Sequence, residues 1–300
     1  MSSRRRSDLI VLIVILGSIV ALVLVLAGSW GPFRSVEETV GFGERVGLVD
    51  VVGPIYDARK WVNEIDEFRE NDRIKAIVIR LDSPGGAVAA SQELYEAVKR
   101  ASDEKPVIAS MGNVAASGAY YAALGADSIV ANPGTTTGSI GVIMELLLVE
   151  GLFEKVGLQT EVVKSGEYKD AGNPSRQLTE AERRYFQGYI DDAFREFVDV
   201  VIDERGLERA DVESVADGRV FTGTQAVEHG LVDILGDQYL AVRLAAQMAG
   251  IEGEPVLVRP YRRSELDWVD LLLDNLLGRA TERVQGHSSF KYLWKAESTR

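Results

Sequence analysis

The stretch IKAIVIRLDSPGG, residues 74–86, decides the predicted fold. Residues 74–81 form a nearly continuous apolar run, which is typical of a strand covered on both faces, as in a parallel sheet. The run stops at the turn 82–86, and residues 87–101 then place apolar side chains at helical spacing. A buried strand followed at once by a helix predicts one unit of an α/β fold.

The same alternation continues on both sides of this unit. Expected strands are residues 46–52, 106–111, 128–131 and 159–164, and expected helices are residues 57–69, 115–125, 222–230 and 237–249. A longer helix is predicted from a capping box at Thr179 to Gly206. Its apolar and aromatic positions, 185, 189, 194, 197, 198 and 201, form a stripe that is typical of a core or of a subunit contact. The sequence therefore predicts an α/β fold with a largely parallel sheet.

Composition excludes several classes of protein. The chain has 300 residues, enough for one or two domains, and its formal net charge of -13 disfavours a general nucleic-acid binder, because phosphate binding needs a basic surface. It has no cysteine, which excludes a disulfide framework, a cysteine nucleophile and a thiolate metal site. With only two histidines, His229 and His287, a histidine-rich metal centre is excluded too.

The N-terminal segment predicts a membrane anchor. Residues 9–27 carry no charge and would span roughly 28 Å as a helix, about the thickness of the hydrocarbon core. Arginines at positions 4–6 place the N-terminus in the cytoplasm and the rest at the outer face. A signal peptide cleaved near Ala27 is the alternative. The expected organisation is a cytoplasmic N-terminus at 1–8, the anchor at 9–27, a linker at 28–44, a folded domain at 45–250 and a C-terminal extension at 251–300.

Two segments at strand ends could carry chemistry. In the turn 82–86, two glycine amides beside the start of a helix can bind an anion, although such a turn requires these residues in any case. In NVAASGAYYAA, residues 113–123, Ser117 precedes a run of small residues, with the Gly118 amide beside its hydroxyl. The plain alternative is a tightly packed helix in which the serine is merely small.

A nucleophilic serine needs a base, and the sequence offers few candidates. His229 falls at an expected helix C-terminus, and His287 lies in a polar tail. Lys164 ends an expected strand, and Lys169 lies in the loop SGEYKD, residues 165–170. A loop lysine is ordinarily a solvated charge, so residue type alone does not assign the base.

Four motifs in a fixed order decide between these interpretations. They are DSPGG at 82–86, AASGAYY at 115–121, TGSIGV at 137–142 and SGEYKD at 165–170. In this order they resemble the signal peptide peptidase A family, peptidase family S49, in its short single-repeat form, over roughly residues 45–250. The resemblance implies a ClpP/crotonase-like fold of repeated ββα units and a serine protease domain with a Ser–Lys dyad, without a metal or another cofactor.

The resemblance also implies a role for individual residues. Ser117 would be the nucleophile and Lys169 the general base. Ser139 would orient the lysine, and the Gly86 and Gly118 amides would form the oxyanion hole. A lysine accepts a proton only when neutral, and its reference pKa is about 10.4, so burial in the assembled site would have to lower it to roughly 7–8.

The implied substrates are signal peptide remnants and other hydrophobic peptides released in the membrane. The predicted anchor would touch membrane lipid and keep the site, at the outer face of the cell membrane, within reach of such peptides. The resemblance further implies a homo-oligomer with the site between neighbouring subunits, and no nucleic-acid partner.

Three other functions remain open at this stage. One is a ClpP-like membrane serine protease of the stomatin-associated type, which also combines a Pro-Gly-Gly turn with a Ser–Lys dyad. Another is a crotonase-type acyl-CoA enzyme, in which Ser117 and Lys169 would be idle. The third is a non-enzymatic membrane scaffold built on a protease fold.

Overall fold

The computed structural model describes residues 44–260 and 291–293. Residues 1–43 lie outside the described residues. They include the predicted N-terminus at 1–8, the predicted anchor at 9–27 and all of the predicted linker 28–44 except its last residue. Among the residues that are described, no helix has both the length and the apolar composition that crossing a bilayer requires.

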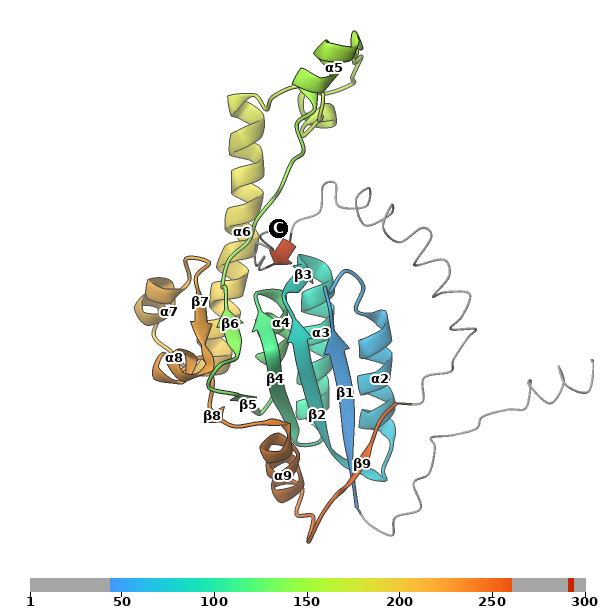
Figure 1. Cartoon of the computed structure of the whole chain (residues 1–300), viewed down its shortest axis with the longest axis vertical. Helices are drawn as coiled ribbons and strands as arrows, with labels where there is room; N and C mark the ends of the chain where they lie inside the picture. The colour runs from blue at the N-terminus through green and yellow to red at the C-terminus, as the bar shows by residue number, and fades with distance from the viewer. Residues whose placement is uncertain (1–43, 261–290, 294–300) are drawn as a thin grey trace, which may run out of the picture. The chain divides into compact units, whose positions relative to one another are not determined.

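A largely parallel sheet forms the centre of the described part (Figure 1). Its strands are β1 (Arg45–Val52), β2 (Ile74–Ser83), β4 (Val107–Ala116), β5 (Ser128–Ala131), β6 (Thr136–Gly138), β7 (Val220–Thr222), β8 (Ile234–Leu235) and β9 (Val256–Val258). The main path runs β7–β6–β4–β2–β1–β9, while β5 pairs with β4 and β8. Within this sheet the described pairs are parallel except β6–β7. The predicted α/β fold is confirmed.

Helix α9 (Gln238–Met248) covers one face of the sheet. It places small buried side chains against the strands, which lets the helix approach closely. The cluster contains Ala241, Ala245 and Ala246 of α9 with Val46, Leu48, Ala76, Val78, Ile108 and Val130 of the strands. The helix begins at Asp237, whose side chain accepts from Leu240 N–H at 2.9 Å.

Helices α2 (Arg59–Glu70) and α3 (Val88–Ser102) pack on the opposite face. Gly47 alternates with the residues that meet α9, so it faces the other way. The Phe68 ring of α2 lies over it, and a Cβ at Gly47 would come within 2.4 Å of that ring. The Trp61 indole donates to Asp50 O at 2.9 Å and fixes α2 to β1.

The long helix α6 (Glu180–Arg205) begins with the predicted capping box. Glu182 N–H donates to Thr179 Oγ1 at 3.2 Å, and Thr179 N–H donates to the Glu182 carboxylate at 2.9 Å. The predicted stripe divides into two parts. Phe197 lies in the core near the C-terminal end, as do Val198 and Val201, whereas Tyr185 and Tyr189 are about half exposed.

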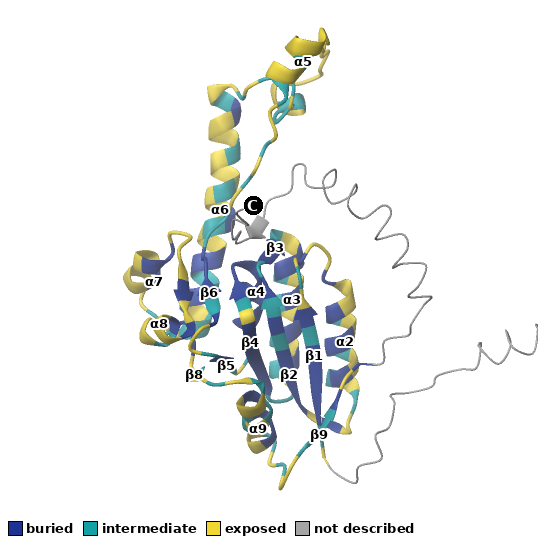
Figure 2. Cartoon of the chain, in the orientation of Figure 1, coloured by how far each residue is buried: buried dark blue, intermediate teal, exposed yellow. Residues whose placement is uncertain are grey.

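Residues 143–179, which we call the arm, extend beyond the end of the sheet together with the first part of α6 (Figures 1 and 2). The arm contains α5 (Glu150–Val156) and a 3-10 turn, η1 (Glu167–Asp170), and neither has a buried residue. The predicted strand at 159–164 is wrong, because these residues are exposed and irregular. Without a neighbouring strand, their apolar pattern has no sheet to join.

Strand β4 runs further than predicted, and the helix after it is shorter. The expected strand 106–111 continues to Ala116, because residues 114–116 pair with β6. The expected helix 115–125 is reduced to α4 (Gly118–Ala123). Helix α8 (Gly223–Glu228) agrees with prediction, while α7 (Arg209–Val215) was not expected.

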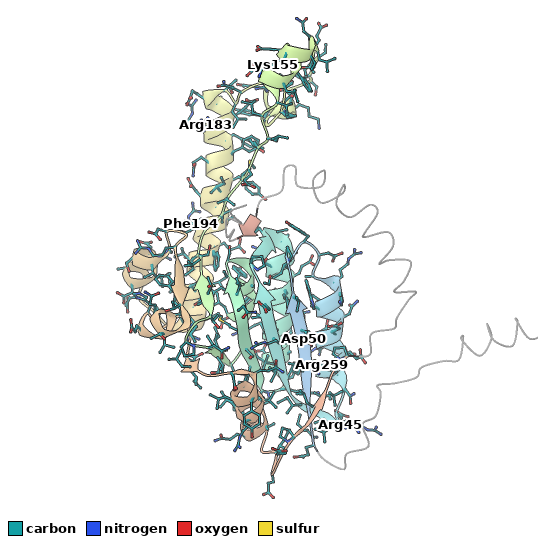
Figure 3. All side chains as sticks on the ribbon, viewed as in Figure 1. Arg45, Asp50, Lys155, Arg183, Phe194 and Arg259 are labelled. Carbon is teal, nitrogen blue, oxygen red and sulfur yellow. The ribbon has the colours of Figure 1, made fainter. Side chains whose placement is uncertain are left out.

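Two strands in the predicted C-terminal extension pair with strands of the folded domain. β9 pairs with β1, and the Arg259 guanidinium lies 3.3 Å from the Asp50 carboxylate beside them (Figure 3). β10 (Lys291–Leu293) pairs antiparallel with β3 (Gly85–Ala87) in a separate small sheet, with residue 292 opposite Gly86. The chain near its C-terminus therefore lies against the glycine-rich turn.

Candidate active site

Ser117 occupies the junction between β4 and α4, where the backbone is strained. Its φ of 54° and ψ of -117° are values that residues with a side chain rarely adopt. Its N–H donates to Gly138 O at 2.8 Å, and its carbonyl accepts from Tyr121 N–H at 2.8 Å. Because bonds on both sides fix the strained backbone, the position of the hydroxyl is set by the fold. Strain held in this way is common at active sites.

Ser139 lies beside Ser117 and also has a positive φ. Ala116 and Gly138 are the last paired residues of the parallel strands β4 and β6, and the two serines follow them directly. The φ of Ser139 is 52°, and its N–H donates to Arg219 O at 2.8 Å. It is 7% exposed. The structure thus brings together two of the predicted site residues.

The two predicted oxyanion amides lie on elements that contact each other, β3 and α4. Gly118 is the first residue of α4, where an N–H has no acceptor within the helix. In β3, Ala87 N–H donates to Ile55 O, and Gly85 O accepts from Ile55 N–H. Since successive residues of a strand face opposite sides, the N–H and C=O of Gly86 point away from Ile55. The Gly118 amide is therefore available to a ligand, and the Gly86 amide faces the edge of β3 at which β10 pairs.

Two threonines that the sequence analysis did not single out support this region. The Thr135 hydroxyl donates to Gly112 O, and the Thr137 hydroxyl donates to Ala115 O, each at 2.7 Å. Both side chains are buried, and they tie β6 and the loop before it to β4. The run of three threonines at 135–137 was the available signal, but threonine is common in strands for packing reasons alone.

Lys169 is not brought to Ser117 within one chain. It lies in the exposed turn η1 of the arm, whereas Ser117 is buried in the body of the fold (Figure 1). Within the described residues, its ammonium group makes no hydrogen bond or ion pair. Its role as a base stays a prediction.

Ionic contacts hold the turn that carries Lys169. The Lys164 ammonium contacts Glu167 O at 2.8 Å and the Asp170 carboxylate at 2.5 Å. The Arg176 guanidinium pairs with Asp170 at 3.0 Å and with Glu182 at 2.5 Å. Hydrogen bonds from Lys164 and Arg176 lower the pKa of Asp170. The bonds from Arg176 and from Thr179 lower the pKa of Glu182 to about 2. These contacts engage Asp170 away from the amine of Lys169.

The arm exposes apolar side chains along most of its length. Val163 is 95% exposed, and seven other leucine, isoleucine and valine side chains of the arm are at least 40% exposed: Ile143, Leu147, Leu148, Leu152, Val156, Leu158 and Val162. Burial of such side chains is the main driving force of protein association. Figure 3 shows charged Lys155 and Arg183 on the same projecting part, so its surface is mixed and not uniformly apolar.

The structure places one of the two histidines and shows which metal-binding side chains gather in the described part. His229 ends α8, as expected, and its ring lies 5.0 Å from that of Phe221. His287 lies outside the described residues. In residues 44–260 and 291–293, no group of three or more metal-binding side chains is present.

Comparison with known families identifies the class of protein. The model of peptidase family S49 matches residues 99–252, and a Clp protease model matches residues 47–136. The first includes Ser117, Ser139 and Lys169, and the second includes Gly86. The matches together cover residues 47–252, which include β2 to β8 and the arm described above.

Related proteins match over much of the chain. A protein of Synechocystis sp. named as a candidate protease is 43% identical over 214 residues, which cover 71% of this chain and 77% of that protein. One of Methanocaldococcus jannaschii, named likewise, is 32% identical over 83% of this chain and 82% of its own length. The chloroplastic serine protease SPPA of Arabidopsis thaliana is 38% identical over 68% of this chain, which is 30% of its own length. With the family model matching more than half of the residues, the chain belongs to peptidase family S49 and is a serine protease.

Proposed function

We propose that this protease is a membrane-anchored endopeptidase in which Ser117 attacks the peptide bond and Lys169 of a neighbouring copy acts as the general base. The observation that carries the proposal is the strained backbone of Ser117, held by Gly138 and Tyr121 at the start of a helix. A serine in this setting presents its hydroxyl beside the Gly118 amide, as an acyl-enzyme mechanism requires.

The exposed position of Lys169 supports a dyad shared between two protomers. The arm offers its apolar side chains for contact with another copy, and the ionic contacts of Asp170 keep the shape of the turn. A lysine enclosed by such a contact would lose solvation and become neutral, as a base must be. Ser139, directly beside Ser117, would then accept or donate a hydrogen bond that orients the amine.

The reaction proceeds through a covalent intermediate. Lys169 takes the proton of Ser117, and the serine oxygen adds to the carbonyl carbon of the peptide. The Gly86 and Gly118 amides stabilise the resulting oxyanion, and the loss of one such donor typically costs about a hundred- to thousandfold in rate. The lysine then protonates the leaving amine. Afterwards it activates a water molecule that releases the acyl group from Ser117.

Signal peptide remnants and other hydrophobic peptides are the proposed substrates. An Enterococcus faecium relative, 37% identical over 60% of this chain, carries the name signal peptide peptidase. Residues 9–27, if they anchor the chain in the membrane, would hold the catalytic domain at the outer face, close to apolar peptides that partition into the bilayer.

The test labels the active serine directly. A fluorophosphonate probe is applied to the full-length wild type and to the Ser117→Ala, Ser139→Ala and Lys169→Ala variants, and the labelled peptide is mapped by mass spectrometry. We expect labelling at Ser117 in the wild type, none in Ser117→Ala, and loss of both labelling and peptide turnover in Lys169→Ala.

A matched control is Lys155→Ala, because Lys155 is another lysine of the arm, on α5 (Figure 3). This variant is expected to keep activity. Peptide turnover that survives Ser117→Ala and Lys169→Ala would overturn the dyad, and acyl-CoA turnover in both variants would favour the crotonase-type reading.

A further inference from the structure

One carboxylate, that of Asp82, joins the strand that ends at Ser117 to the strand that leads to Gly86. Asp82 Oδ1 accepts from Val114 N–H at 3.2 Å, and Asp82 Oδ2 accepts from Asn113 Nδ2 at 3.0 Å. Asp82 lies on β2 shortly before the glycine turn, and Val114 lies on β4 shortly before Ser117. Each bond is thus made close to a predicted site residue.

These bonds fall on an irregularity of β4. The two strands pair Leu81 with Met111 and Ser83 with Ala115, so Asp82 alone lies opposite residues 112–114. Against β1, β2 pairs without a register shift from Ala76 to Asp82. The bulge therefore belongs to β4, and a bulge leaves backbone groups without a ladder partner and redirects the strand. Asp82 supplies the missing acceptor for Val114 N–H.

The bulge is closely fitted around the Asp82 side chain. A Cβ added at Gly112 would lie 2.8 Å from Asp82 Cγ and 3.0 Å from Asp82 Oδ2. From its other side, Gly112 O accepts from the buried Thr135 hydroxyl. The carboxylate thus packs against a residue that has no side chain, and the bulge is held from both neighbouring segments.

We propose that Asp82 is a positioning residue, which fixes the offset between the Ser117 hydroxyl and the Gly86 amide. This proposal rests on the proposed function, in which the Ser117 hydroxyl and the Gly86 amide act on the same peptide carbonyl of the substrate. An oxyanion donor works only within about 2.7–3.1 Å of the oxygen it stabilises, and a displacement of about 1 Å can cost about a hundredfold in rate. Without the carboxylate, the end of β4, together with the β6 residues paired with it, is free to shift relative to β2 and to carry Ser117 away from Gly86.

The experiment compares Asp82→Ala with Asp82→Asn in the full-length protein. Asparagine keeps an oxygen for Val114 N–H, and the Asn113 amide can turn to pair with its NH2 group. The matched control is Asp127→Ala, because the Asp127 carboxylate accepts from Val107 N–H at 2.7 Å at the other end of β4. Steady-state kinetics on a fluorogenic peptide and the melting temperature are measured for each variant.

We expect Asp82→Ala to lower kcat by about tenfold or more with KM little changed, and Asp82→Asn to stay within about threefold of the wild type. Asp127→Ala should lower the melting temperature without lowering kcat. If Asp82→Ala does not fold, Asp82→Glu takes its place, since its longer side chain keeps the charge but not the spacing, and kcat should again fall.

The outcomes separate this inference from the proposed function. A wild type that is active and loses its activity in Ser117→Ala upholds the function. In that case, full kcat in Asp82→Ala, or in Asp82→Glu where it is the variant tested, overturns the positioning role. If kcat falls as much in Asp127→Ala as in Asp82→Ala, then Asp82 makes only a general structural contact. This result would also overturn the positioning role. Activity that survives Ser117→Ala would contradict the proposed function itself.

Discussion

Ser117 and Ser139 follow the last paired residues of two adjacent parallel strands, and both have a positive φ, 54° and 52°. Neither backbone is free to relax, because Ser117 N–H bonds to Gly138 O and Ser139 N–H bonds to Arg219 O. The sheet thus sets the two serines side by side at the ends of these strands. Placing them there has an energetic cost, which can be measured.

The strain at Ser117 predicts that glycine is more stable than alanine at this position. Both substitutions remove the hydroxyl, but only glycine adopts a φ of 54° and ψ of -117° without a steric penalty. We expect Ser117→Gly to exceed Ser117→Ala in free energy of unfolding by about 1 kcal/mol, after allowance for the greater flexibility of glycine in the unfolded chain. Urea unfolding of both variants checks this, and equal stabilities would argue against strain.

Gly86→Ala is expected to lower the rate of peptide hydrolysis strongly. A Cβ at this position would lie 2.0 Å from Ile55 O, so the β3 backbone must move and carry its amide away from the oxyanion. The rate should fall by about a hundredfold or more. The control is Gly134→Ala, since a Cβ at Gly134 meets nothing within 4 Å. The rate of peptide hydrolysis is measured for both variants. If Gly86→Ala keeps the wild-type rate, Gly86 is not a donor of the proposed oxyanion hole.

A dyad shared between protomers predicts that two inactive variants restore each other. Ser117→Ala still supplies Lys169, and Lys169→Ala still supplies Ser117. When equal amounts are dissociated and reassembled together, about a quarter of the sites should combine both intact residues, as in a random symmetric oligomer. Peptide turnover of the mixture is the measurement. If the mixture stays inactive while reassembled wild type recovers, the two residues act within one chain.

The Arg176–Glu182 pair predicts a pH-dependent contribution to stability. The pKa of Glu182 is lowered to about 2, chiefly by its hydrogen bonds to Arg176. A lowered carboxylate pKa stabilises the folded state above the unfolded pKa, about 4.3, and this contribution is lost as the pH falls through about 2. Glu182→Gln should therefore be less stable than the wild type at pH 7, and the difference should disappear between about pH 4 and 2.

Urea unfolding at several pH values tests this expectation. Glu213→Gln is the matched control, because the Glu213 side chain is 57% exposed and lies 3.6 Å from Arg209. An exposed pair of this kind contributes little at any pH. A constant difference between wild type and Glu182→Gln down to pH 2 would contradict the assignment.

The pairing of β10 with β3 predicts that the end of the chain competes with peptides. Gly86 N–H and C=O face the edge at which β10 lies, and an extended peptide would add at an edge of this kind. Deletion of residues 291–300 should lower KM in proportion to the fraction of molecules in which β10 occupies the edge, with kcat unchanged. Deletion of 294–300 alone keeps β10 and should have no effect. Equal KM values for both deletions would show that the edge is not occupied in solution.

Much of the body could be predicted from the sequence, because local and long-range preferences agree there. The apolar run 74–81 forms β2, and the box at Thr179 begins α6 with both expected bonds. Ser117 and the glycine turn that carries Gly86 also follow strands, as the motifs indicated, whereas Lys169 does not. In such segments, the pattern of one element is enough to place its ends.

The rest depends on contacts that sequence spacing does not report. Strand β4 passes position 111 because Asp82 and β6 support it from both sides. Tyr185 and Tyr189 belong to the same stripe as Phe197, yet they are half exposed, because the first part of α6 lies outside the body and only its later part packs in the core. The separation of Lys169 from Ser117 could likewise not be predicted from the sequence pattern, since it depends on the direction in which the arm extends.

Neither α5 nor η1 has a buried residue, and partly exposed ionic contacts help to hold the turn that carries Lys169, so ionic strength becomes a variable of this protein. Dissolved salt screens a pair in proportion to its exposure. The Lys164 side chain is 33% exposed, whereas the Glu182 side chain is 3% exposed. A rising salt concentration should therefore weaken the Lys164–Asp170 contact of η1 first. The Arg176–Glu182 contact should stay intact. The amine of Lys169 would then gain freedom of orientation before the arm loses its fold.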